Sequence, residues 1–238
     1  MSHRSLTALA LLGSLATSPA GATAADFDPT DRYEVRDIRG WTVLIHEGLL
    51  RDHPELADHT LTLLTQQLDQ VVRAVPAGAV AAQRKVRIRV EWEEPHHPCM
   101  AYHPDAGWLR DHGMNPEKAR GVEIANARNF LAWTADQPWM VLHELAHGYH
   151  DRDLEDGFGN AEVRAAYDRA MGAGLYDSVL RIGGEDERAY AATNPMEYFA
   201  EASEAFFGTN DFYPFVSAEL RRHDPEMYAL LEKLWRRP

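Results

Sequence analysis

The stretch His143-Glu144-Leu145-Ala146-His147 has the pattern H-E-x-x-H and lies in a segment with helical periodicity. Residues four apart on a helix lie on the same face, one turn apart. Two imidazoles at this spacing can bind one Zn²⁺, and Glu144 can reach a water molecule on that ion. The pattern therefore predicts a metal site formed by His143 and His147, with Glu144 as a general base.

The helix that carries this motif is predicted to begin near residue 137. Asp136 is a suitable N-cap, and Pro138 suits the first turn. One face is apolar and would pack against the core, through Leu142, Leu145, Ala146 and Tyr149. The alternative is a chance match, because the chain has 12 His and a buried His is usually a hydrogen-bonded core residue.

A third ligand is expected from a second predicted helix, residues 195–207, which Gly208 would end. Glu197, Glu201 and Glu204 share one face of this helix, and clustered carboxylates repel one another unless a cation lies among them. Glu197 is the preferred ligand and Glu201 the alternative. Asn194 and Glu197 also have the spacing of a capping box, and Glu201 and Glu204 could simply form a solvated face.

These two motifs together resemble the gluzincin metallopeptidases, and more closely the catalytic domain of anthrax toxin lethal factor and its exported relatives. The resemblance is carried by H-E-x-x-H and by the second helix, in which Asn194, Glu197 and Phe199-Ala200-Glu201-Ala202 match. It implies that Glu197 binds zinc and that Glu201 supports a ligand histidine from the second shell. It also implies that Tyr190, seven residues before Glu197, hydrogen-bonds the oxyanion of the tetrahedral intermediate.

Without the resemblance, Tyr190 could equally be a tyrosine packed under the site, and Tyr149 and His223 are weaker rivals for the oxyanion. His150 shares the face of His143 and His147 but lies too far along the helix to join them, so an outer or surface role is expected. The cluster His96-His97-Pro98-Cys99, with His103, could be a second metal site or a thiolate that blocks the zinc. The favoured interpretation is a proline-rich loop with local hydrogen bonds.

The remaining pattern predicts an α+β fold with a β-rich N-terminal lobe, a helical C-terminal lobe and the H-E-x-x-H helix between them, as in zincin-like peptidases. Residues 33–38 and 41–46 read as a hairpin around Arg39-Gly40, and residues 93–120 as a long loop. Strands are expected at residues 85–91 and 122–124, with a further short strand as one reading of Phe130 and Leu131. Residues 122–124 are the candidate sheet edge for an extended substrate. Helices are expected at 54–75, 161–170, 216–222 and 225–235.

Net charge and the N-terminal segment indicate which partners and which location are expected for this protein. The net charge of -13 disfavours nucleic acids and anionic membranes. Residues 1–24 are predicted to be a cleavable signal peptide, because Arg4 precedes an apolar run at 6–16 and Ala22-Thr23-Ala24 suits signal peptidase. That run is too short for a membrane anchor, so residues 25–238 should form one secreted or periplasmic domain. Cys99 is the single cysteine, which excludes an intrachain disulfide.

The sequence therefore predicts an exported zinc metalloendopeptidase that uses one Zn²⁺ and acts on peptides or proteins. A catalytically silent, zinc-stabilised binding or inhibitory module is the alternative, although a purely structural site has no need of Glu144. A metal-buffering protein ranks last, because the histidines are scattered along the chain.

Overall fold

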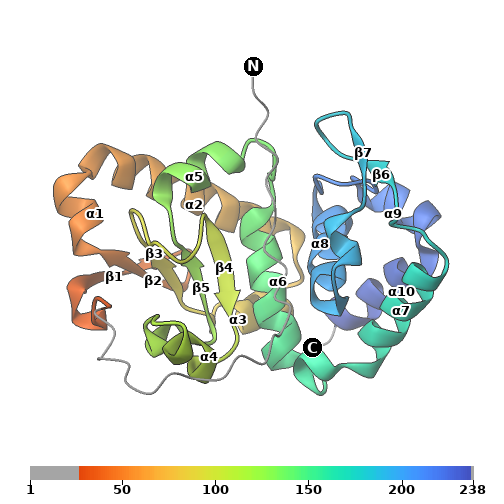
Figure 1. Cartoon of the computed structure of the whole chain (residues 1–238), viewed down its shortest axis with the longest axis horizontal. Helices are drawn as coiled ribbons and strands as arrows, with labels where there is room; N and C mark the ends of the chain where they lie inside the picture. Colours follow the sequence, from red (N-terminus) through yellow and green to blue (C-terminus); the bar gives the residue numbers. More distant parts are fainter. Residues whose placement is uncertain (1–26, 237–238) are drawn as a thin grey trace.

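The computed structural model describes residues 27–236. The predicted signal peptide, residues 1–24, lies outside the described residues. Two lobes stand side by side: one holds a five-stranded sheet and its covering helices, and the other is mainly helical (Figure 1). Helix α6, Met140–Asp153, lies between them and carries the H-E-x-x-H motif. The predicted α+β class and the place of this helix are confirmed.

The sheet has the strand order β1-β2-β3-β5-β4. Its strands are β1 Tyr33–Ile38, β2 Trp41–His46, β3 Ile88–Val90, β4 Met100–His103 and β5 Gly121–Ile124. The β1–β2 hairpin turns at Arg39 and Gly40, which both have positive φ, at 57° and 89°. Such a turn follows the natural twist of paired strands. Strands β2, β3 and β5 are parallel, while β4 runs antiparallel to β5 and forms the edge of the sheet.

Alternation along the central strands separates an apolar face from a charged one. The apolar face is buried under helices and consists of Val43, Ile45, Ile88, Val90, Val122 and Ile124. The helices of this lobe are α1 Glu47–Asp52, α2 Pro54–Ala74, α3 Ala77–Gln83, α4 Ala106–Asp111 and α5 Ala127–Trp133. The other face carries buried charges that pair with one another: Glu123 bonds His103 at 2.7 Å and Lys118 at 2.5 Å. Paired charges of this kind tolerate burial because each is compensated.

The helical lobe packs on the opposite side of α6. It contains α7 Ala161–Gly172, the short hairpin β6 Val179–Leu180 and β7 Asp186–Glu187, α8 Pro195–Phe207, α9 Ser217–His223 and α10 Pro225–Trp235. Trp235 stacks on Tyr149 of α6 at 4.4 Å between ring centroids and on Phe199 of α8 at 5.6 Å. These buried aromatic contacts fix α8 and α10 against α6.

Three local predictions are wrong. Residues 93–120 are not one loop, because they contain β4, α4 and a 3₁₀ turn at Pro116–Lys118. The chain near Phe130 is helical, since α5 runs to Trp133. Helix α6 begins at Met140, so Asp136 does not cap it; the amide of Asp136 instead bonds the carbonyl of Trp133 in the turn that ends α5. None of the helices in residues 27–236 combines the length and apolar character needed to cross a bilayer.

Candidate active site

Helices α6 and α8 pack side by side and bring the two motifs together (Figure 1). The Asn194 side chain caps α8 by accepting from the amides of Met196 and Glu197, which places Glu197 in the first turn. From there its Oε2 lies 3.0 Å from Nε2 of His143 and 3.2 Å from Nε2 of His147. The Glu197 carboxylate therefore faces the histidines, and the described contacts include no return bond to the Asn194 amide that would complete a capping box.

The geometry of these three side chains fits a tetrahedral zinc ion. Ligand atoms about 2.0–2.2 Å from such an ion lie roughly 3.3 Å from one another. The separations of 3.0 and 3.2 Å agree with this value, and all three candidate ligand atoms lie within 4.8 Å of one another. Both histidine side chains are buried. His143, His147 and Glu197 therefore form a candidate metal site with the donor set of a catalytic zinc centre.

Without a metal, the pKa values of His143 and Glu197 are shifted by their neighbours in this site. Burial opposes ionisation of Glu197, but His147 and His143 outweigh it and hold the pKa of the carboxyl well below its usual range. Burial likewise opposes a charged His143, yet bonds to Glu197 and Glu204 raise its pKa well above 6.5. A cation is thus favoured between the imidazoles and Glu197.

Glu204, and not the predicted Glu201, is the carboxylate nearest to Nδ1 of His143. Nδ1 of His143 hydrogen-bonds Oε1 of Glu204 at 2.7 Å, whereas Oε1 of Glu201 is 3.8 Å away. The His143 ring spans the space between α6 and α8, with Nε2 toward Glu197. Seven residues make almost two complete turns, so Glu204 returns to the face of Glu197, while Glu201 is rotated by about 40°. The regular spacing of the three glutamates in the sequence could have suggested Glu204.

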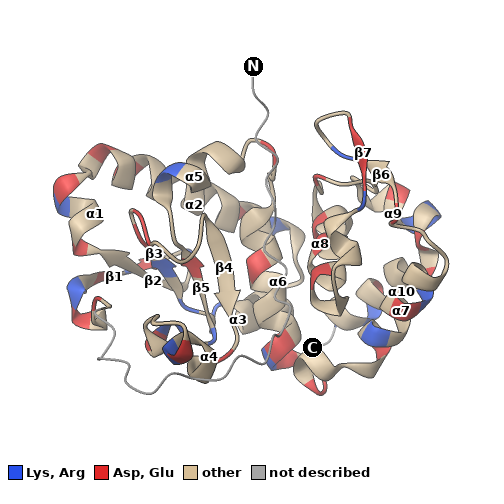
Figure 2. Ribbon diagram, viewed as in Figure 1, with Lys and Arg blue, Asp and Glu red and all other residues tan. Residues whose placement is uncertain are grey.

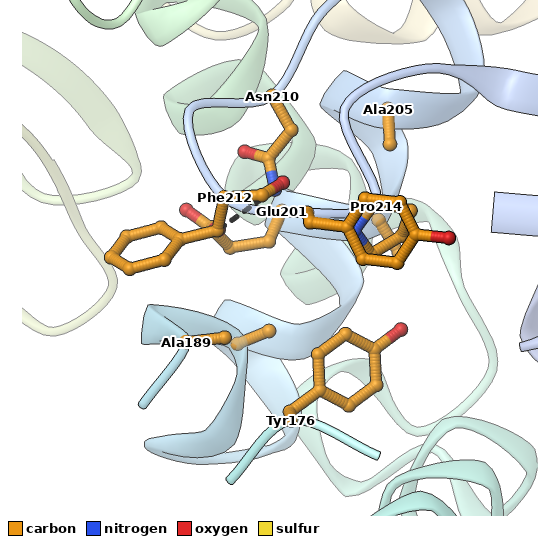
Figure 3. A pocket seen from close by; sticks show the side chains of 10 residues that line it. Tyr176, Ala189, Glu201, Ala205, Asn210, Phe212 and Pro214 are labelled. Atoms are coloured by element: carbon orange, nitrogen blue, oxygen red, sulfur yellow. Dashed lines mark hydrogen bonds between the residues drawn. The ribbon is translucent and has the colours of Figure 1, made fainter. Parts of the chain in front are cut away.

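Glu201 faces a different part of the helical lobe. Its Oε2 accepts a hydrogen bond from Nδ2 of Asn210 at 3.0 Å, and the same amide nitrogen donates to the carbonyl of Phe212 (Figure 3). The adjoining cavity, between α8 and the segment around Pro214, measures about 10 Å³. This is space for about one water molecule. A cavity of this size is too small to accept a substrate.

Several acidic side chains are buried together near His143: Glu201, Glu204 and Asp211. Figure 2 shows acidic residues on α6 and on the neighbouring α8. Burial raises the pKa of Glu204 to about 7, and burial together with Asp211 and Glu204 raises the pKa of Glu201. Burial also raises the pKa of Asp211, although Arg181 opposes the shift. Carboxyls that carry protons can remain packed together behind His143 without the full cost of buried like charges.

Glu144 lies beside the edge of the sheet. Its Oε2 accepts a hydrogen bond of 2.7 Å from the backbone amide of Tyr102 in β4. The edge strand next to the H-E-x-x-H helix is therefore β4. The prediction that residues 122–124 form this edge is wrong, because β5 is paired on both sides, with β3 and β4. The signal for β4 was weak, since only four residues between Pro98 and Pro104 form the strand.

Tyr190 lies beside the candidate ligand Glu197. It belongs to the 3₁₀ turn before α8, and its hydroxyl donates to Oε1 of Glu197 at 3.2 Å. The two rival groups point elsewhere. The Tyr149 hydroxyl donates to the carbonyl of Leu234, and Nε2 of His223 lies 2.8 Å from the carbonyl of Leu175.

The other histidines in residues 27–236 lie outside the candidate metal site. His150 is fully buried between Phe158 and Phe199, so of its two expected roles, outer or surface, the surface position is wrong. His96 contacts Glu94 at 2.5 Å, and His103 contacts Glu123. Neither joins a group of possible metal ligands among residues 27–236.

Cys99 is buried, with Sγ 3.6 Å from Sδ of Met140. Burial, with a smaller contribution from Glu144, raises the pKa of the thiol to about 12. The thiol therefore stays protonated at neutral pH, which argues against a thiolate that blocks the zinc.

Comparison with known proteins identifies the class. The sequence profile of the glucose-regulated metallo-peptidase M90 family matches residues 123–236, just under half of the chain, and this part includes both site motifs. No curated protein matches the chain. Among solved structures, the Pro-Pro endopeptidase PPEP-2 from Paenibacillus alvei is similar, with 18% identity and a TM-score of 0.44. The alignment covers 81% of this chain and 95% of that protein.

The matching profile is that of the M90 family, whereas the sequence motifs resemble the lethal-factor group. Both place the chain in the same broad class, and the histidine and glutamate side chains meet as that class requires. The chain is a zinc metallopeptidase of the H-E-x-x-H type.

Proposed function

We propose that this protein is an exported gluzincin-type endopeptidase that hydrolyses peptide bonds with Glu144 as the general base. The observation that carries the proposal is the meeting of Glu197 with His143 and His147 at 3.0 and 3.2 Å, with Glu144 on the same helix. A zinc ion bound there would lower the pKa of a bound water to about 7 and polarise the scissile carbonyl.

The residues around the site supply the proton transfers. Glu144 takes the proton of the attacking water and delivers it to the leaving amine. Burial, together with Glu197, raises the pKa of Tyr190, so its hydroxyl keeps its proton. A protonated phenol beside Glu197 can donate a hydrogen bond to the developing oxyanion. Glu204, bonded to Nδ1 of His143, holds the imidazole with Nε2 toward Glu197.

The substrate is proposed to bind as an extended strand along β4. Ala125 donates to the carbonyl of Cys99, so Cys99 and Ala101 direct their backbone groups toward β5. Met100 and Tyr102 alternate with them and direct their backbone groups outward, toward α6 and the site. An extended peptide could pair with the carbonyls of these two residues and the amide of Met100. Backbone pairing of this kind favours peptides that have no regular structure at the cleaved bond.

The decisive experiment is cleavage of a diverse peptide library by the purified mature protein, with and without a chelator, beside Glu144→Gln. The proposal expects chelator-sensitive cleavage, restored by zinc, which the variant loses while it keeps one zinc per chain. Equal zinc binding with no cleavage by either protein would favour the silent binding module instead. Mapping the cut sites separates an endopeptidase from an enzyme that trims chain ends.

Export is a separate part of the proposal and rests on residues 1–24 alone. Expression of the full chain in a bacterial host and N-terminal sequencing of the protein outside the cytoplasm test it directly. The expected mature protein begins at Ala25. Retention of the complete N-terminus in the cytoplasm would contradict export and leave the peptidase proposal unaffected.

A further inference from the structure

Tyr102 contacts the active-site helix at two points that lie two turns apart. Its backbone amide donates to Oε2 of Glu144 at 2.7 Å, and its phenol donates to Oδ2 of Asp151, also at 2.7 Å. Residues 144 and 151 are separated by almost two complete turns, so both carboxylates lie on the same face of α6. One residue of the edge strand thus bonds both the expected general base and a second carboxylate.

The amide of Tyr102 is available because β4 is an edge strand. Successive backbone amides of a strand point to opposite sides, and the neighbouring Ala101 pairs with Glu123 of β5. The Tyr102 amide consequently points away from the sheet and toward α6. A fixed backbone donor costs little reorganisation when it bonds a carboxylate, and the bond leaves the second oxygen of Glu144 free.

The side chain of Tyr102 is held by the sequence of α6 itself. Gly148 lies between Glu144 and Asp151 on the same face, and a Cβ there would come within 3.3 Å of Cε2 of Tyr102 and 2.9 Å of Cγ2 of Val86. The glycine therefore allows the ring to lie close to the helix. Phe158 contacts the same ring edge-on, with centroids 6.3 Å apart. The phenol is thus directed to Asp151 by packing on two sides.

We propose that Tyr102 and Asp151 form a clamp that positions Glu144: the phenol–carboxylate bond fixes β4 on α6, and the Tyr102 amide then holds one oxygen of Glu144. The other oxygen is left to take the proton of the attacking water. Tyr102 and Asp151 are positioning residues in this role, because the Tyr102 amide, the phenol and the Asp151 carboxylate touch neither metal nor substrate. The inference rests on the proposed function of Glu144.

The geometry gives the clamp a kinetic signature. A general base that loses its fixed orientation reduces the rate of the chemical step, whereas binding of the substrate backbone by Met100 continues. Loss of the Tyr102 hydroxyl should therefore lower kcat about tenfold or more and change KM by less than about twofold. Zinc content should stay at one ion per chain, because none of the candidate ligands has changed.

The test compares Tyr102→Phe, Asp151→Ala, their double variant and Asp151→Asn in the full mature protein, with thermal stability and zinc content measured for each. The two single variants and the double variant should show the same loss of kcat, because each breaks the same bond. Asp151→Asn should recover most of the activity, since its amide oxygen can still accept from the phenol. Tyr33→Phe is the matched control, because it breaks a tyrosine–glutamate bond, to Glu91, on the other face of the sheet.

Several outcomes would overturn the clamp. An unchanged kcat in Tyr102→Phe, a rise in KM alone, or additive losses in the double variant would each do so. If Tyr102→Phe fails to fold, the kcat of Asp151→Ala tests the clamp instead. This variant is expected to fold, because Asp151 is partly exposed and alanine has a high helix propensity. A wild-type protein that binds zinc but cleaves no peptide would remove the proposed function and the clamp with it. Cleavage by wild type and equally by both variants would remove the clamp alone.

Discussion

Glu197 and Glu204 lie at opposite sides of the His143 imidazole. This arrangement predicts how much each glutamate of α8 contributes to zinc affinity. Glu197→Ala removes a direct candidate ligand and should weaken zinc binding most. Glu204→Ala removes the partner of Nδ1 of His143 and should cost about 10–100-fold in affinity. Glu201→Ala should cost less than either, because Glu201 bonds Asn210 instead.

Competition for zinc with a chromophoric chelator measures this order. Glu155→Ala, at an exposed position outside α8, is the control and should leave the affinity unchanged. A larger loss in Glu201→Ala than in Glu204→Ala would contradict the geometry of the His143 contact.

His150 is expected to make the metal-free protein sensitive to acid. Burial, with a smaller contribution from His147, lowers its pKa to about 3 from an ordinary 6.5. Between these values the unfolded chain binds a proton that the folded protein does not, so stability is lost as the pH falls from 6.5 toward 3. At pH 5 the loss from this group is about 2 kcal/mol relative to pH 7.5.

His150→Leu should remove this part of the pH dependence. It should also raise stability at pH 7.5 by about 1 kcal/mol, because neither ring nitrogen of His150 has a hydrogen-bond partner within residues 27–236. Urea unfolding between pH 5 and 7.5, with chelator present to exclude metal release, provides the measurement. His59→Leu, at an exposed position on α2, is the control, and an unchanged pH slope in His150→Leu would refute the assignment.

At the scale of elements, the contact between α6 and α8 depends on a residue with no side chain. Gly208 ends α8 directly against Trp139, which precedes α6, and a Cβ at Gly208 would lie 1.8 Å from Cε2 of the indole. Gly208→Ala should therefore displace the indole and destabilise the protein by about 1–3 kcal/mol. The midpoint of urea unfolding reports the loss.

Gly172→Ala is the matched control for this prediction. Gly172 is the last residue of α7, and a Cβ there would have no neighbour within 4 Å. Alanine at this helical position should be neutral or stabilising by up to about 1 kcal/mol. Equal destabilisation by the two substitutions would mean that the Trp139 contact is not the cause.

At the scale of the whole molecule, the candidate metal site connects the two lobes. His143 and His147 come from the central helix, and Glu197 from α8 of the helical lobe. A ligand that binds only the folded state stabilises it, by about 2.7 kcal/mol at a concentration 100-fold above its Kd. Zinc should therefore raise the Tm of the metal-free protein, and Glu197→Ala should lose most of this shift while its metal-free Tm stays near that of wild type. An equal shift in wild type and variant would place the zinc elsewhere.

The elements that periodicity describes well could be predicted from the sequence. Helices α2, α8 and α10 were expected to within a residue, since each has a clear apolar face and a recognisable start at proline. The hairpin at Arg39-Gly40 was also expected. Strand β4 was not, because a strand of four residues gives too short an alternation to be distinguished from loop. The start of α6 was misplaced because a turn after α5 used Asp136.

The kind of chemistry that this protein carries is already indicated by its local sequence spacing. Spacing along single helices is a local property, so the pairing of His143 with His147 and the shared face of the α8 glutamates could be read directly. The hydrogen-bond partner of each group, in contrast, depends on how the elements pack against one another. The choice of Glu204 over Glu201, the burial of His150 and the bond from Tyr102 to Glu144 depend on how α6, α8 and β4 pack. Such packing joins residues far apart in the chain, and no local pattern records it.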